Sequence, residues 1–337
     1  MDKKQFKYLT EYSILMYLNK YMFIQQMELD VFAKYQNTFT EENPCNIYFI
    51  LRRPRISADP EYFIVGEDFI ELKYFIHIKN ERLERILRVP FSDLPSDLRM
   101  ETEYPHNFVK FIDKEGNING YKLAVLVDET HKWNGPKEDL LDFEVLYIGQ
   151  AFGKDGKRTA LDRLSSHSTL QKIYSEAMFR NPDSEIWIML ASFEQNKVMS
   201  MNGMVQMPSE NDKEDTARAA KFFNSEIEFT EKQVINFTEA ALIKTFLPQY
   251  NKEYKDSFPN PSHSSYSECY NLDVNSIVVE TDTRESRRWL YSVDKPRKID
   301  GEMGLEYWQH GLFHFQNSED RYKMFNYEYL ETEDKSG

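Results

Sequence analysis

Apolar positions near the N-terminus recur at the spacing of an amphipathic helix. Within residues 3–36, Ile14, Leu15, Leu18 and Met22 recur at intervals of three or four residues, and no glycine or proline interrupts the stretch. Positions at these intervals lie on one face of a helix with 3.6 residues per turn. The pattern therefore predicts a long N-terminal helix that ends before a turn at Asn43-Pro44.

Residues 46–78 instead predict three strands. Runs of β-branched and aromatic residues alternate with turn signals around Pro54, Pro60 and Gly66. The runs are 47–51, 62–65 and 74–78. With a short helix expected over 81–86, this part of the chain reads as an N-terminal α+β domain, residues 1–117.

Strands and helices alternate in the central part of the chain. Strands over 121–127 and 143–148 are joined by a polar loop, which predicts an antiparallel hairpin. Helices are expected over 159–179 and 231–246, with an apolar strand over 185–193 between them.

This order of elements predicts an α+β fold in three parts. We expect a small central antiparallel sheet flanked by helices over residues 118–258. The N-terminal α+β domain precedes it, with a role in recognition or oligomerisation. A C-terminal extension over 259–337 follows it and contains a further strand over 276–280.

The helix expected over 231–246 carries a carboxylate on its apolar stripe. Thr230 is a suitable N-cap, and Gln233 is its capping-box partner. Glu239 falls in the middle of a stripe formed by Ile235, Leu242 and Phe246. A buried carboxylate is costly unless it is paired or binds a cation. For this residue taken alone, a salt-bridged glutamate at the edge of the stripe is the simpler interpretation.

The charge distribution limits which surfaces could bind nucleic acid. The net charge is −14, which opposes non-specific binding of a polyanion by the whole surface. A local excess of basic residues nevertheless occurs between 151 and 172. We expect nucleic-acid contacts from four of these residues, namely Lys154, Lys157, Arg158 and Lys172.

Cysteine usage and apolar runs indicate a cytoplasmic protein. The two cysteines, Cys45 and Cys269, lie far apart and lack metal-ligand spacing, as expected of free thiols in a reducing compartment. No secretory signal or membrane-spanning run is visible, so we expect no membrane partner.

Residues suited to phosphodiester chemistry occur in a defined order. Tyr147-Ile148-Gly149 ends a strand, and Arg163 and His167 follow four residues apart, on one face of a helix. Glu239 and Asn251, the latter in Pro248-Gln249-Tyr250-Asn251, come next. Taken singly, each has a simple structural explanation. In this order, over about residues 118–255, they resemble the GIY-YIG nuclease superfamily, in particular its restriction- and homing-endonuclease branches.

The resemblance implies a role for each residue. Tyr147 would lie close to the attacking water, and Arg163 would hold the scissile phosphate. His167 would hydrogen-bond a tyrosine or the phosphate. Glu239 would be the single metal-binding carboxylate, for Mg²⁺ or Mn²⁺, and Asn251 would brace the site.

The first motif of the family departs from the expected pattern. No Gly-Ile-Tyr occurs in the strand expected before residue 143, where the chain reads Gly120-Tyr121-Lys122-Leu123. In the family this tyrosine is a candidate general base. Two alternatives stay open: Tyr121 supplies the hydroxyl from a shifted position, or the first tyrosine is lost.

From the resemblance we expect a metal-dependent endonuclease that hydrolyses phosphodiester bonds in DNA, in restriction or anti-phage defence. One alternative is a non-catalytic nucleic-acid-binding module with a degenerate domain, and another is an RNA-cleaving effector. The flanking regions would recognise substrate, form a homo-oligomer or sense a trigger. His310 and His314 also have zinc-ligand spacing for a helix, but no third ligand accompanies them.

Overall fold

The computed structural model describes most of the chain. The described residues are 8–29, 31, 38–40, 43–91, 97–133, 138–150, 168–201, 209–224, 230–255, 258, 274, 276–297 and 307–314.

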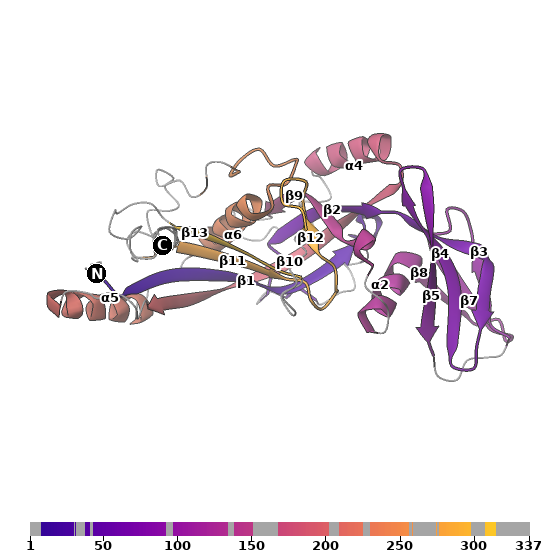
Figure 1. Ribbon diagram of the computed structural model, residues 1–337, viewed down its shortest axis with the longest axis horizontal. Coiled ribbons are helices and arrows are strands. Elements are labelled where there is room, and N and C mark those ends of the chain that lie inside the picture. Colours follow the sequence, from indigo (N-terminus) through magenta and orange to yellow (C-terminus); the bar gives the residue numbers. More distant parts are fainter. Residues whose placement is uncertain are drawn as a thin grey trace, which may run out of the picture.

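A seven-stranded mixed sheet forms the centre of the molecule, in the order β12-β9-β2-β10-β1-β11-β13. Its pairs are antiparallel except for β1 with β11 and β12 with β9, which are parallel. The strands are β1 (Thr10–Ile24), β2 (Ile47–Pro54), β9 (Phe143–Gln150), β10 (Ser184–Met201), β11 (Ser276–Asp282), β12 (Leu290–Tyr291) and β13 (Trp308–His314). Figure 1 shows β1 and β10 extending together toward α5 (Asp212–Asn224).

This sheet corrects the predicted fold class. The protein is not built on a small central sheet flanked by helices, because the largest sheet has seven strands and takes them from residues 1–117, 118–258 and 259–337 alike. Long-range pairing, which the local pattern could not reveal, sets this architecture.

The predicted N-terminal helix was wrong for residues 10–24, which form β1. Tyr12, Ile14 and Met16 are buried at every second position, as in a strand with one face on the core. Leu15 and Leu18 had also satisfied the helical spacing. Pairing with β10 along most of its length and with β11 decides between the two patterns.

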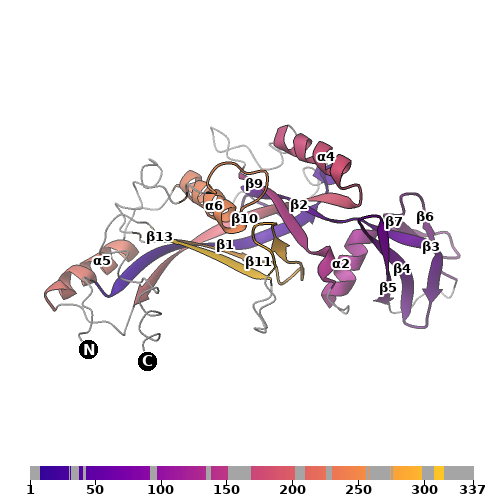
Figure 2. The same ribbon diagram turned by 45° about the horizontal axis from the view of Figure 1, so that its top comes forward.

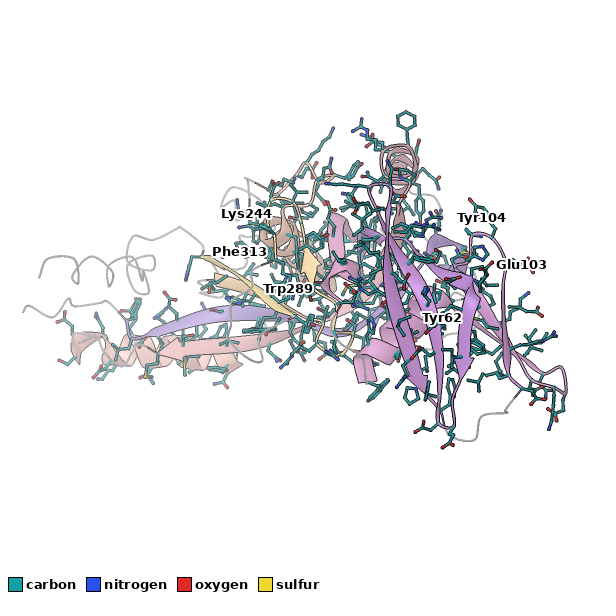
Figure 3. The ribbon with its side chains drawn as sticks, turned by 45° about the vertical axis from the view of Figure 1, so that its right-hand side comes forward. Tyr62, Glu103, Tyr104, Lys244, Trp289 and Phe313 are labelled. Carbon is teal, nitrogen blue, oxygen red and sulfur yellow. The ribbon has the colours of Figure 1, made fainter. Side chains whose placement is uncertain are left out.

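Two three-stranded antiparallel sheets are inserted between β2 and β9. The first contains β3 (Ile56–Val65), β4 (Phe69–Ile78) and β5 (Glu81–Pro90), and the second contains β6 (Arg99–Thr102), β7 (Phe108–Ile112) and β8 (Ile118–Lys122). We call residues 56–133, which end with helix α2 (Leu123–Trp133), the insert. Figure 2 shows the insert at one end of the molecule, and Tyr62 and Tyr104 mark it in Figure 3.

Two local predictions within this region were also wrong. The short helix expected over 81–86 is part of β5, which pairs with β4 along its whole length. The hairpin expected between 121–127 and 143–148 does not form, because β8 pairs with β7 and β9 pairs with β2. The apolar run after Lys122 begins α2, which buries Leu123, Leu126 and Val127 at helical spacing.

Helices cover opposite faces of the β9-β2-β10 part of the sheet. Helix α6 (Glu231–Phe246) packs in one cluster with Phe49 and Ile148, whereas α4 (Ser168–Arg180) packs in another with Tyr48 and Ile50. The predicted bounds of α6 and its capping box between Thr230 and Gln233 are confirmed. Short 3-10 helices are η1 (Gln26–Glu28), η2 (Asp139–Leu141) and η3 (Ser209–Asn211).

Buried ion pairs join the insert to the sheet. Arg53 of β2 donates to Asp128 of α2 at 2.8 Å and to Glu185 of β10 at 3.1 Å. Arg288 also donates to Asp128, at 2.6 Å. The Arg53 guanidinium lies 4.4 Å from the ring centre of Trp187, so a cation–π contact adds to the charge pairing. No helix in the described part of the chain has the length and apolarity to span a bilayer.

Candidate active site

Two tyrosines from adjacent strands meet on the face covered by α4. Strands β2 and β9 are antiparallel, with Tyr48 opposite Gly149 and Ile50 opposite Tyr147. The ring centres of Tyr48 and Tyr147 are 6.2 Å apart. Tyr48 is fully buried, and Tyr147 packs half-buried against the same cluster. The pairing therefore places two hydroxyl-bearing rings side by side.

Position 149 requires glycine for a steric reason. A Cβ atom there would lie 2.5 Å from the Tyr48 hydroxyl oxygen and 2.8 Å from a ring carbon of Tyr147. Both distances are far below a van der Waals contact, so a larger residue would have to displace a tyrosine. Gly149 therefore provides the space in which the two rings meet.

A β-bulge changes the direction of one side chain in β9. Regular alternation along a strand would place Val145, Tyr147 and Gly149 on the same face. Leu51 pairs with Val145 and Ile50 with Tyr147, so Leu146 is the extra residue of the bulge. Val145 consequently packs in the cluster on the α6 face, whereas Tyr147 packs on the α4 face.

The segment after α6 covers the open edge of β9. Strand β12 pairs only with Phe143 and Glu144. Further along β9, the Tyr250 N–H donates to the Leu146 carbonyl at 3.0 Å. The Asn251 amide donates to the Ile148 carbonyl at 2.8 Å, and its oxygen accepts from the Ile148 N–H at 2.9 Å. These bonds satisfy an otherwise exposed edge and hold the Tyr147-Ile148-Gly149 segment of the strand.

Glu239 is buried on α6, with 8% of its surface exposed. The predicted stripe is confirmed, because Ile235, Leu242 and Phe246 are buried with it. One turn earlier, Asn236 accepts a hydrogen bond of 2.9 Å from the side chain of Gln150, at the end of β9. Residues three apart share a helical face, so Glu239 lies on the side of α6 that meets the end of β9.

The charge of Glu239 changes the pKa of a neighbouring tyrosine, Tyr254. Burial raises the pKa of Tyr254, and the Glu239 carboxylate raises it further. Tyr254 follows the Asn251 segment, so the carboxylate, the end of β9 and that segment lie close together. This arrangement leaves a buried acidic group beside the strand that carries Tyr147.

Several residues predicted for the site lie outside the described residues. They are Arg163 and His167, and the basic residues Lys154, Lys157 and Arg158. Lys172 is described: it lies exposed on α4, 3.8 Å from Glu176, with its ammonium 6.0 Å from the ring centre of Tyr250. Within the described part, Asn251 binds the strand that carries Tyr147. Glu239 lies on α6, the helix that packs against this strand.

Tyr121 lies in a different sheet. It is on β8 of the insert, where its ring centre is 5.8 Å from that of Phe111. The tyrosine beside Tyr147 is instead Tyr48, which sequence reasoning missed. The signal was the dipeptide Ile47-Tyr48, which matches the last two letters of the first motif of the family that the sequence resembles. It lies in an earlier strand, and the insert separates it from Tyr147.

The described residues contain no group of three or more His, Cys, Asp or Glu side chains placed to hold a metal. A site of one carboxylate, as expected for Glu239, would not form such a group. His310 and His314 lie on strand β13, so the helical zinc spacing does not apply to them. Burial lowers the pKa of His314.

The arrangement combines paired phenols, a buried carboxylate and a strand held by an amide clamp. The phenols lie on the α4 face of the sheet, whereas Glu239 lies on α6, which covers the opposite face, so a common site would have to form around the end of β9, where Gln150 contacts Asn236. No family model, curated protein or solved structure matches this chain.

Proposed function

We propose that this protein is a metal-dependent endonuclease that hydrolyses phosphodiester bonds in DNA. The observation that carries the proposal is the meeting of Ile47-Tyr48 and Tyr147-Ile148-Gly149 across one strand pair, with Tyr48 opposite Gly149. It supports the resemblance noted in the sequence by supplying a first-motif tyrosine next to the second. Restriction or anti-phage defence is the setting that we propose by analogy with the family alone.

The two tyrosines would act on the attacking water. Their rings lie on one face with centres 6.2 Å apart, and in this proposal one water would contact both hydroxyls. We assign the general-base role to Tyr48, because it lies on the strand paired with β9, opposite Gly149. Tyr147 would orient the same water against the scissile phosphate.

Glu239 would hold the metal ion. It is a buried carboxylate beside the end of β9, and Mg²⁺ suits a site with one carboxylate because it keeps several of its waters. When bound, Mg²⁺ or Mn²⁺ would supply positive charge that stabilises the leaving oxygen.

The remaining roles follow the resemblance. Arg163 would hold the phosphate through a bidentate fork, and His167 would hydrogen-bond a tyrosine or the phosphate. Lys172, exposed on α4, would contact the DNA backbone outside the site, together with Lys154, Lys157 and Arg158. Asn251 would keep Tyr147 in place by holding the next residue of the strand, Ile148.

Nicking of a supercoiled plasmid in Mg²⁺ or Mn²⁺ tests the proposal. We expect Glu239→Ala and Tyr48→Phe each to lose about 10²–10³-fold in rate, because the first removes the proposed metal ligand and the second the proposed general base. Tyr121→Phe, which changes an exposed tyrosine of the insert, is the matched control and should cleave like the wild type.

Other outcomes would contradict the proposal in distinct ways. Equal losses in Tyr121→Phe and Tyr48→Phe would overturn the assignment of the first tyrosine. Degradation of RNA without cleavage of duplex DNA would favour the RNA-cleaving alternative. A folded protein that binds DNA but cleaves neither substrate in either metal would favour the non-catalytic module.

A further inference from the structure

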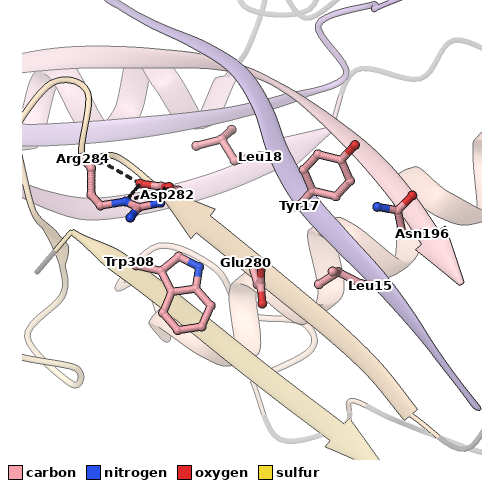
Figure 4. Close-up of a pocket in the computed structure, with 8 residues that line it drawn as sticks. All are labelled: Leu15, Tyr17, Leu18, Asn196, Glu280, Asp282, Arg284 and Trp308. Carbon is pink, nitrogen blue, oxygen red and sulfur yellow. Dashed lines mark hydrogen bonds and ion pairs between the residues drawn. The ribbon is translucent and has the colours of Figure 1, made fainter. Parts of the chain in front are cut away.

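A cavity of about 480 Å³ opens on the seven-stranded sheet (Figure 4) and takes no lining residue from β2 or β9, the strands of the candidate active site. It is lined by Leu15, Tyr17, Leu18, Asn196, Glu280, Asp282, Arg284 and Trp308, from strands β1, β10, β11 and β13 and the turn after β11. Leu15 and Tyr17 alternate with the core residues Ile14 and Met16, so the cavity lies on the face opposite α6. Its volume is within the range of small-molecule sites.

The strand register assembles its polar wall. Tyr17, Glu280 and His310 are aligned across β1, β11 and β13, and Asp282 is opposite Trp308. The Trp308 and His310 rings are in contact, with centres 5.1 Å apart. Two carboxylates of β11 and the indole of Trp308 on β13 therefore line the same cavity, and Leu15 and Leu18 supply apolar surface beside them.

The two carboxylates that line the cavity, Glu280 and Asp282, differ in their pairing with positive groups. The Arg284 guanidinium donates to both oxygens of Asp282 at 2.9 Å and lowers the pKa of that carboxyl group. Tyr17 donates to Glu194 at 2.6 Å. Among the described residues, the Glu280 carboxylate has no hydrogen bond or ion pair, and no Lys or Arg lies over the ring of Trp308.

We propose that this cavity binds an organic cation, an alkylammonium or guanidinium group. The cation would pair with Glu280 and lie against the Trp308 indole, since the face of an indole attracts cations. Its alkyl chain would contact Leu15 and Leu18. Glu280 and Glu194 would repel an anion. The cation could belong to a free polyamine or to a basic side chain of a peptide, and this inference does not depend on the nuclease proposal.

Titration followed by the indole N–H signals of ¹⁵N-labelled protein tests the proposal. The chain has four tryptophans, and the Trp308→Leu variant identifies the signal of Trp308 by its loss. The probe is n-butylammonium, with n-butanol as its neutral counterpart. We expect butylammonium to shift the Trp308 signal first and to bind more tightly than butanol.

Two variants and one control complete the experiment. Glu280→Gln and Trp308→Leu should each weaken butylammonium binding about fivefold, as expected for a half-exposed ion pair or cation–π contact. Trp133→Leu, an exposed tryptophan of the insert, should bind like the wild type. Binding in the Trp308→Leu variant is followed by the backbone amides of β11 and β13.

The source of the cation is distinguished by two further probes, spermidine and a lysine-containing tripeptide. Tighter binding of either one supports the proposal and identifies the source. Three results would overturn the proposal. The first two are equal binding of butanol and butylammonium, and a response confined to other tryptophans. The third is the absence of a shift at 10 mM of every ammonium probe, which is roughly the weak limit for so few contacts.

Discussion

The side chain of Asn251 binds both backbone groups of Ile148, donating to its carbonyl at 2.8 Å and accepting from its N–H at 2.9 Å. The two residues are 103 positions apart, yet the pair acts like a short added strand on the edge of β9. Tyr250 extends the contact by one bond to Leu146. The position of the end of β9, and therefore of Tyr147, depends on the buried side-chain amide of Asn251.

Replacing this amide should destabilise the protein. Asn251→Leu would leave the N–H and carbonyl of Ile148 buried without partners, at a cost of about 2–4 kcal/mol in the free energy of unfolding. Urea unfolding followed by circular dichroism measures the change. Gln249→Ala, two residues earlier and exposed, is the control and should stay within about 0.5 kcal/mol of the wild type. Similar values for both variants would contradict the clamp.

The ion pairs at the base of the insert should contribute far more than a surface pair of similar geometry. Asp128→Ala removes a partner of Arg53 and of Arg288, both buried, and should cost about 3–5 kcal/mol. Asp282→Ala breaks the exposed pair with Arg284 and should cost about 0–1 kcal/mol. Urea unfolding of the two variants provides the comparison. A loss below about 1 kcal/mol for Asp128→Ala would show that water reaches both guanidinium groups.

A buried histidine in the same cluster should make stability depend on pH. Burial and the positive charge of Arg288 lower the pKa of His131 to about 4. In the unfolded chain the group would take up a proton near pH 6.5, so the unfolded state binds more protons between about pH 4 and 6.5. This group therefore contributes stability that rises with pH across that window and is lost on acidification.

Unfolding midpoints between pH 4 and 7 measure this contribution. We expect His131→Gln to flatten the rise seen in the wild type, whereas His310→Gln, at an exposed position, should leave it unchanged. Asp142 acts in the opposite sense, because burial raises its pKa to about 6 and favours the protonated folded state. A double variant with Asp142→Asn separates the two groups. An unaltered slope in His131→Gln would assign the pH dependence elsewhere.

The sequence was sufficient where neighbours along the chain decide the structure. Helix α6 was predicted to the residue because Thr230 and Gln233 cap it locally, and because Ile235, Leu242 and Phe246 share one stripe. Asn251 was singled out, but its partner was not, since no local rule connects it to Ile148 across 103 residues.

The sequence was insufficient where distant strands decide the structure. In β1, Tyr12 and Leu15 belong to different faces of a strand, yet both are compatible with one apolar helix, and only pairing with β10 separates the alternatives. The sequence did not indicate Tyr48 as a site residue for a similar reason. Tyr48 becomes the neighbour of Tyr147 only because β2 and β9 pair with each other although the whole insert separates them in the sequence. The periodicity of apolar residues does not reveal the closure of such a long loop.

Gly149 offers the sharpest test of how the two tyrosines depend on each other. In Gly149→Ala the new Cβ would lie 2.5 Å from the Tyr48 hydroxyl oxygen, so overpacking should cost about 1–3 kcal/mol and displace a ring. Removing the ring in the double variant Gly149→Ala, Tyr48→Leu relieves that clash. The double variant should therefore lose less stability than the sum of its single variants, a coupling that a double-mutant cycle in urea measures. If the proposed function holds, nicking activity should stay low in all three variants, since each lacks the correctly placed hydroxyl. Additive free energies would show that the two side chains do not share the space between β2 and β9.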